Sequence, residues 1–262
     1  MRLEVIKEEP LAAGRPTPIL FVHGMWHAAW CWAEHFLPDF ARHGYSSYAL
    51  SLRGHGGSEG RERLRWTSLA DYVSDLEQVP RQMGRVPVLV RHSMGGMAVQ
   101  KSLESQVAPA AVLLASAPPS GLVRATLRVA SRHLLVFMRA NLKMSPFPIV
   151  STVELAREAL FSRGMPEERV QRYLSRLEDE SYRAYLDMIG LRLPRPRRLR
   201  TPLLVLGGAD DRLISPSEVA ATARAFGTSA EIFPNMAHDM MLEDGWPKVA
   251  DRILVWLNEQ GL

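Results

Sequence analysis

The chain has 262 residues, of which 47% are hydrophobic and 23% are charged, and its formal net charge is +4. These values exclude a disordered or fibrous chain and are typical of a soluble globular protein. The length fits one α/β domain with an insertion. A chain of this size buries about three quarters of the surface that it exposes when unfolded, which leaves room for a pocket that excludes water.

Three features of the sequence bear on location. The N-terminal segment mixes charged residues into a strand-like alternation and lacks the apolar region of a secretion signal. No run of about 18 apolar residues occurs. The single cysteine, Cys31, rules out an intramolecular disulfide and agrees with a reducing compartment. We therefore expect a cytoplasmic protein with no stable membrane insertion.

Strand and helix signals alternate along most of the chain. Seven short, mostly apolar segments predict strands: Leu3–Glu8, Pro18–Val22, Ser47–Ser51, Pro87–Arg91, Ala111–Ser116, Pro202–Leu206 and Ala230–Phe233. Amphipathic segments between them predict helices: Ala29–His43, Ser68–Met83, Ser93–Ser105, Ser217–Phe226 and Trp246–Glu259. This alternation is typical of an α/β fold, in which a mostly parallel sheet is covered by helices on both faces.

The alternation stops in the middle third of the chain. Apolar residues there recur three and four positions apart over Val123–Leu142, Thr152–Phe161 and Glu167–Ile189, which predicts helices. We therefore predict a helical cap over 118–200, inserted into a core domain formed by 1–117 and 201–262.

The predicted cap is also the basic part of the chain. From Gly121 to Arg200 there are sixteen Lys or Arg and eight Asp or Glu, against sixteen and twenty elsewhere. Two interpretations remain open: solvated arginine-rich helix faces, or a surface that attracts an anionic ligand. A nucleic-acid partner is not expected, since the segment has neither interleaved aromatic residues nor a helix-turn-helix pattern.

An apolar segment runs directly into Ser93 and is followed by two glycines. A strand that ends in serine and turns at once into a helix presents the hydroxyl at the carboxyl edge of a sheet, where it can act as a nucleophile. Small residues are expected two positions before and after this serine, because strand and helix approach closely there. Gly95 fits this pattern. Arg91 does not, so we expect its side chain to escape toward solvent or to distort the turn.

A serine nucleophile needs a base, and the base needs a carboxylate that fixes its tautomer. Among eight histidines, His238 lies in a loop between the last predicted strand and the last predicted helix. Asp210 and Asp211 follow the preceding strand, so serine, acid and histidine occur in the order expected for this architecture. The backbone N–H groups of Met25 and Met94 are the candidate oxyanion donors.

Five motifs carry a resemblance to a known family: Phe21-Val-His-Gly-Met25, Ser51-Leu-Arg-Gly-His-Gly-Gly-Ser58, His92-Ser-Met-Gly-Gly96, Gly208-Ala-Asp-Asp-Arg-Leu213 and Met236-Ala-His-Asp-Met-Met241. With them the chain resembles the α/β-hydrolase superfamily across its whole length. The resemblance implies the α/β-hydrolase fold and selects Asp211 over Asp210, because the acid usually stands three residues after the second glycine of this loop.

Shorter segments resemble particular branches of the superfamily. The segment His27–Trp32 is similar to plant methyl esterases and hydroxynitrile lyases, and Arg53–Ser58 is similar to bacterial esterases and acyl-homoserine lactonases. Met25 stands where the lyases typically carry threonine, which argues against a lyase. Ser93 argues against dehalogenases and epoxide hydrolases, which use aspartate.

These observations predict a serine hydrolase that cleaves a carboxylic ester of a small, largely apolar substrate through an acyl-enzyme. The alternatives are a lactonase of the acyl-homoserine-lactone type and a ligand-binding protein whose catalysis is impaired by Arg91. The sequence does not specify the oligomeric state. The residues expected to bind substrate are Trp26, His27, Leu135, Met138 and Phe147.

No metal or organic cofactor is expected. His23 and His27 are four positions apart, but no acidic third ligand stands nearby. Gly54, Gly56 and Gly60 do not have the G-x-G-x-x-G interval of a dinucleotide-binding loop.

Overall fold

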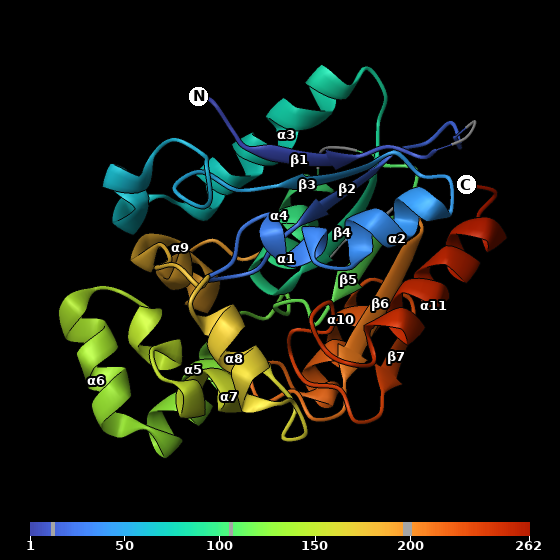
Figure 1. The fold of residues 1–262 in the computed structure, drawn as a ribbon. Helices are drawn as coiled ribbons and strands as arrows, with labels where there is room; N and C mark the ends of the chain where they lie inside the picture. Colours follow the sequence, from blue (N-terminus) through green and yellow to red (C-terminus); the bar gives the residue numbers. More distant parts are fainter. Residues whose placement is uncertain (12–13, 105–106, 196–200) are drawn as a thin grey trace.

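A seven-stranded sheet forms the centre of the protein, seen in a computed structural model that describes residues 1–262 except 12–13, 105–106 and 196–200 (Figure 1). The strand order is β1-β3-β2-β4-β5-β6-β7. β1 pairs with β3 in antiparallel orientation, and the other neighbouring pairs are parallel. The strands are β1 Val5–Glu8, β2 Ile19–Val22, β3 Ser47–Leu50, β4 Val88–His92, β5 Ala111–Leu114, β6 Leu203–Gly208 and β7 Ala230–Phe233.

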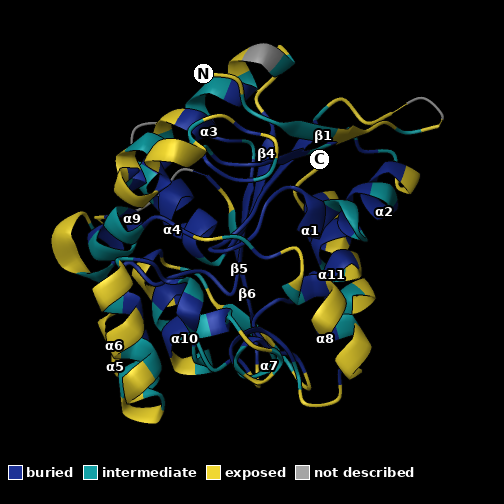
Figure 2. Ribbon diagram, turned by 60° about the vertical axis from the view of Figure 1, so that its left-hand side comes forward, coloured by how far each residue is buried: buried dark blue, intermediate teal, exposed yellow. Residues whose placement is uncertain are grey.

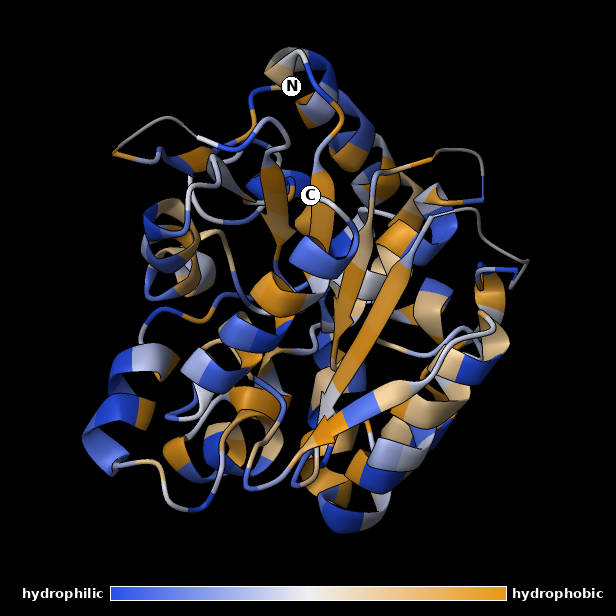
Figure 3. Ribbon diagram, turned by 90° about the vertical axis from the view of Figure 1, so that its right-hand side faces the viewer, coloured by the Kyte–Doolittle hydropathy of each residue, from blue (hydrophilic) through white to orange (hydrophobic). Residues whose placement is uncertain are grey.

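The central strands are buried along their whole length because both faces of the sheet are covered. Every residue of β2, β4 and β5 is buried, as expected for parallel strands between two helical layers. Figure 3 shows the strands of the sheet as mostly hydrophobic, whereas the surrounding helices carry both hydrophobic and hydrophilic residues. The seven predicted strands are confirmed, each within two residues of the observed bounds.

Helices form a layer on each side of the sheet, which confirms the predicted fold class (Figure 2). One layer contains α1 Trp30–Ala33, α2 Phe36–Arg42 and α11 Trp246–Glu259. The other contains α3 Leu69–Met83, α4 Ser93–Ser102 and α10 Pro216–Ala225. The helix predicted over Ser93–Ser105 corresponds to α4, and its predicted end at Ser105 lies outside the described residues.

The prediction of one continuous helix over 29–43 was wrong, because the structure has two helices there, α1 and α2. The chain leaves helical geometry at His35, where φ is −139°. Pro38 explains the break, since it has no N–H with which to continue a helix toward the Glu34 carbonyl. Pro38 instead lies in the first turn of α2, where helical N–H groups have no partner within the helix.

Further helices lie between β5 and β6, below the carboxyl ends of the parallel strands in Figure 1. They are α5 Val123–Arg132, α6 Leu134–Lys143, η2 Phe147–Val150, α7 Val153–Leu160, α8 Glu167–Leu174, α9 Tyr182–Leu186 and η3 Asp187–Leu191; η1 Arg61–Trp66, after β3, was not predicted. Two predicted long helices are broken, one at His133, where φ is −135°, and one between α8 and α9. The predicted cap boundary at residue 200 lies outside the described residues.

Several arginines of this helical segment pair with carboxylates of the core. Arg128 lies 2.5 Å from Glu218, and Arg172 lies 2.5 Å from Glu34. Part of the basic excess seen in the sequence is therefore neutralised where the segment meets the core. In the part of the chain that the structure describes, no helix has both the length and the apolar character needed to cross a membrane.

Candidate active site

Ser93 stands at the junction of β4 and α4, in a conformation that favours a nucleophilic role. Its φ of 50° lies in the left-handed region, which is uncommon for a residue with a side chain and is found at strained functional turns. Two glycines make this turn sterically possible. A Cβ on Gly24 would lie 2.8 Å from the Ser93 Cβ, and one on Gly95 would lie 2.5 Å from the His23 carbonyl oxygen.

The structure brings Ser93, His238 and Asp211 into one chain of hydrogen bonds. The Ser93 Oγ lies 2.9 Å from Nε2 of His238, and Nδ1 of His238 lies 2.8 Å from Oδ2 of Asp211. The other carboxylate oxygen of Asp211 accepts from the backbone N–H of Leu213 and of Ile214, at 2.8 and 2.9 Å. This arrangement leaves Nε2 of His238 free to accept the serine proton. Asp210, by contrast, is exposed.

The electrostatic surroundings of His238 favour its protonated form. Burial lowers the pKa of the imidazole, but the charge and hydrogen bond of Asp211, together with the charge of Asp239, raise it above its ordinary value of 6.5. The two carboxylates thus stabilise the imidazolium that would form when His238 takes a proton.

The two candidate oxyanion donors come from adjacent segments. Met94 is the second residue of α4, so its N–H belongs to the first turn, where helical N–H groups have no partner within the helix. Met25 lies in the loop after β2. That loop is held by the cap, because the backbone N–H of Glu178 donates to the Trp26 carbonyl at 2.8 Å.

A mostly apolar pocket opens above the serine. Met25, Trp26 and Ser93 form its floor, and it is further lined by Leu122, Ala125, Thr126, Val129, Phe137, Ile149, Tyr185, Leu213 and Ile214. The positions 122, 125, 126 and 129 have the spacing of one helix face. That periodicity was visible in the sequence and could have identified these pocket residues, which the sequence analysis missed.

Of the five residues expected to bind substrate, only Trp26 lines this pocket. Leu135 and Met138 do not line it, and their side chains are 80% and 49% exposed, so their contact with substrate stays a prediction. A new helix starts at Leu134, and in it Phe137 faces the pocket instead. Phe147 packs partly buried against the core. His27 is fully buried, and its Nδ1 lies 2.7 Å from the Met25 carbonyl oxygen.

A sequence model of the alpha/beta hydrolase family matches residues 19–252. The chain belongs to the alpha/beta hydrolase family. The chain is 32% identical over 114 residues to the probable esterase PIR7A of Oryza sativa subsp. indica, covering 39% of this chain and 40% of that protein. It is 32% identical over 93 residues to methyl jasmonate esterase 1 of Vitis vinifera, covering 34% of each chain. The matches therefore span two fifths or less of the length of these relatives.

Solved structures share the fold over nearly the whole chain. The monoacylglycerol lipase of Paleococcus ferrophilus matches with a TM-score of 0.73 and 19% identity, covering 99% of this chain and 100% of that one. A thermophilic esterase from Thermogutta terrifontis matches with a TM-score of 0.72 and 20% identity, covering 98% and 94%. At these identities the similarity shows a common fold.

The expectation that the Arg91 side chain turns to solvent was wrong, because Arg91 is fully buried. The turn after β4 holds Ser93 within hydrogen-bond distance of His238. The side chains of a strand alternate between the two faces of the sheet. Arg91 accordingly points between α3 and α4, where Leu76 and Val99 line the same cavity.

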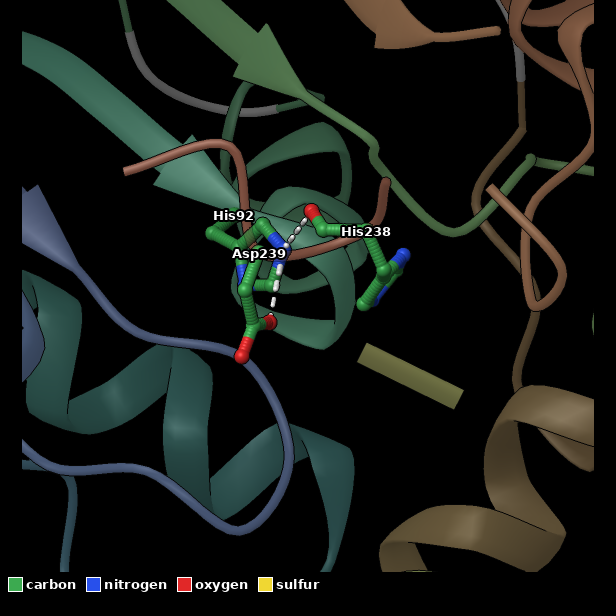
Figure 4. A group of neighbouring side chains, drawn as sticks. All are labelled: His92, His238 and Asp239. Atoms are coloured by element: carbon green, nitrogen blue, oxygen red, sulfur yellow. Dashed lines mark hydrogen bonds and ion pairs between the residues drawn. The ribbon is translucent and has the colours of Figure 1, made fainter. Parts of the chain in front are cut away.

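A second buried network lies beside His238. Nε2 of His92 donates to the His238 carbonyl oxygen at 3.0 Å and lies 3.8 Å from Oδ1 of Asp239 (Figure 4). Oδ2 of Asp239 lies 3.0 Å from Nε2 of His27. In Figure 4 the imidazole of His238 points away from the Asp239 carboxylate. Asp239 therefore joins the loop that carries His238 to the loop that carries Met25.

The ionisation of this network follows from its burial and charges. Burial raises the pKa of Asp239, but the neighbouring histidines, His27 first among them, lower it below its ordinary value. Burial lowers the pKa of His92 to about 3, so this ring is neutral. His92, His238 and Asp239 place potential metal-ligating atoms within 4.8 Å of one another. Both ring nitrogens of His238 are already hydrogen-bonded, however, which fits a proton-transfer site better than a metal site.

Proposed function

We propose that this hydrolase cleaves a carboxylic ester of a small, largely apolar substrate through an acyl-enzyme. The observation that carries the proposal is the hydrogen-bonded series from Asp211 through His238 to Ser93, whose hydroxyl opens into an apolar pocket. The names of the rice and grape relatives, both esterases, agree with it.

In the first half of the reaction, Ser93 Oγ attacks the ester carbonyl carbon while His238 Nε2 takes its proton. The carbonyl oxygen becomes an oxyanion held by the N–H groups of Met25 and Met94. When this intermediate collapses, the bond to the alcohol oxygen breaks, and His238 returns the proton to the departing alcohol. The acyl group remains on Ser93.

In the second half, water attacks the acyl-enzyme and His238 takes a proton from it. The second oxyanion collapses, the bond to Ser93 Oγ breaks, and the serine recovers its proton from His238. The products are a carboxylate and an alcohol. A lactone would use the same groups, and its single product would carry both functions.

The decisive experiment is labelling with a fluorophosphonate, because it reports an activated serine without any assumption about the substrate. We expect the wild-type protein to be labelled and Ser93→Ala to be unlabelled, with the exposed serine variant Ser131→Ala as the matched control. Hydrolysis of p-nitrophenyl butyrate should fall in parallel, by up to about 10⁶-fold in kcat. If Ser93→Ala is labelled and turns over as fast as Ser131→Ala, Ser93 is not the nucleophile.

Substrate class is then tested with linear esters and acyl-homoserine lactones of equal chain length. A higher kcat/KM for the linear esters supports the proposal, and a higher value for the lactones favours a lactonase. Absence of both turnover and labelling in the folded wild-type protein would instead favour a ligand-binding role.

A further inference from the structure

A second cavity lies on the other side of β4 from the His92 side chain, between α3 and α4. Its volume is about 340 Å³, and Arg91 forms part of its lining. Its walls are largely apolar and include Leu76 and Pro80 from α3, Val99 from α4 and Leu103, the residue that follows α4. It shares none of its lining residues with the pocket above Ser93.

The guanidinium of Arg91 has no partner in this cavity. Among the described residues, none forms a hydrogen bond with its Nε, Nη1 or Nη2 atoms, and none forms an ion pair with it, although the residue is fully buried. An arginine carries five N–H donors and a permanent charge, and burying such a charge without a partner is strongly unfavourable. Burial lowers the pKa of Arg91 to about 9, which still leaves it cationic at neutral pH.

Two other charged residues line this cavity, Glu77, which is partly exposed, and Arg81, which is exposed. In the described part of the chain, Glu77 forms no hydrogen bond with the Arg91 guanidinium. The cavity therefore combines a buried, uncompensated cation with apolar walls. Arginine binds carboxylates through two parallel hydrogen bonds. Apolar walls with a few fixed polar groups are what small-molecule sites commonly provide.

We propose that this cavity binds a small carboxylate with a short apolar chain, its carboxylate paired with Arg91 and its chain packed against Leu76, Val99 and Leu103. An inorganic anion would supply the charge but would leave the apolar walls uncovered. The proposal is independent of the chemistry at Ser93, so either can fail without the other.

The test is calorimetric titration of the full chain with sodium hexanoate in chloride-free buffer, with neutral hexanamide as the comparison ligand. We expect hexanoate to bind with one site and hexanamide to bind at least about tenfold more weakly. Arg91→Met, which keeps the length of the side chain and removes its charge, should weaken hexanoate binding at least about tenfold. Glu77→Gln, which removes the nearby negative charge, should strengthen it.

A matched control separates this cavity from the pocket above Ser93. Ala125→Phe fills that pocket and should reduce ester hydrolysis while hexanoate binding is retained. Leu103→Trp keeps Arg91 but fills the new cavity, and it should abolish hexanoate binding even if Arg91→Met fails to fold. The proposal is overturned if hexanoate does not bind the wild-type chain, if Leu103→Trp or folded Arg91→Met binds it as the wild type does, or if Ala125→Phe abolishes binding.

Discussion

The Ser93 Oγ lies 2.9 Å from Nε2 of His238, although 145 positions separate the two residues in the chain. The parallel sheet explains this proximity. Ser93 follows β4 and His238 lies beyond β7, and the carboxyl ends of parallel strands meet at one edge of the sheet. The common edge of the sheet thus fixes the positions of Ser93 and His238 relative to each other.

Asp211 should govern the rate rather than the stability of the site. In Asp211→Asn the carboxylate that accepts the hydrogen bond from Nδ1–H of His238 is replaced by an amide. His238 would then adopt the wrong tautomer, and kcat should fall by about 10⁴-fold. The neighbouring variant Asp210→Asn is a matched control because Asp210 is exposed, and it should keep wild-type kcat. Steady-state assays with p-nitrophenyl butyrate measure both. Equal losses in the two variants would contradict the assignment of Asp211.

Much of this site was predictable because it depends on strand ends. Ser93, Asp211 and His238 each follow a recognisable apolar strand, and parallel pairing then brings them to a common edge. The position of Arg91 was not predictable in this way. Whether a long side chain turns to solvent or into the core depends on the space between α3 and α4, which is a property of the packed structure and not of the local motif.

The cap residues show the same limit. Helical periodicity predicted a helix over Val123–Leu142, but it did not show that the chain leaves helical geometry at His133. After that break a new helix starts at Leu134, and its orientation does not follow from the periodicity of the preceding helix. Phe137 therefore lines the pocket in place of Leu135. The contact between His27 and Asp239 was also missed, because it joins two loops that no periodic pattern relates.

Asp239 should act on the pH dependence of the reaction. Its charge raises the pKa of His238, and His238 must be neutral to accept the serine proton. The acidic limb of the kcat/KM profile should therefore lie above pH 6.5 in the wild type and move to lower pH in Asp239→Asn. The exposed residue Asp251 offers the control variant Asp251→Asn, whose profile should match the wild type. A shift of the Asp239→Asn profile to higher pH would show that the sign of this effect is wrong.

Arg91→Met should stabilise the unliganded protein. It removes an unpaired buried charge and leaves a side chain of similar length against Leu76 and Val99, and replacement of buried charges by apolar groups commonly adds about 1–4 kcal/mol to the free energy of unfolding. Urea denaturation at pH 7 measures the change. Arg91→Gly is the contrasting variant, because it removes the charge but also leaves the space of the side chain unfilled. Its free energy of unfolding should therefore increase less than that of Arg91→Met. If Arg91→Met is less stable than the wild type in carboxylate-free buffer, the guanidinium has a stabilising partner.

The contact between His55 and Glu180 should make the attachment of the cap depend on pH. Glu180 precedes α9, accepts from the Tyr72 hydroxyl at 2.5 Å and lies 3.3 Å from Nε2 of His55, and both charged residues are buried. Burial lowers the pKa of His55, but the charge and hydrogen bond of Glu180 raise it above the ordinary value of 6.5. Because the pKa of His55 is higher in the folded than in the unfolded protein, protonated His55 adds to the free energy of unfolding. This contribution is complete below pH 6.5 and is lost as the pH rises through the folded-state pKa.

The free energy of unfolding should therefore differ most between the wild type and His55→Gln at pH 5.5, and the difference should shrink by pH 8.5. Urea denaturation at the two pH values measures it, with His43→Gln as a control on a half-exposed histidine whose carboxylate partner is 3.8 Å away. Glu180→Gln should remove the pH-dependent part while leaving the Tyr72 hydroxyl an acceptor. A difference that stays constant or grows between pH 5.5 and 8.5 would mean that His55 is not charged in the folded protein, and that neutral hydrogen bonds alone hold the cap at this point.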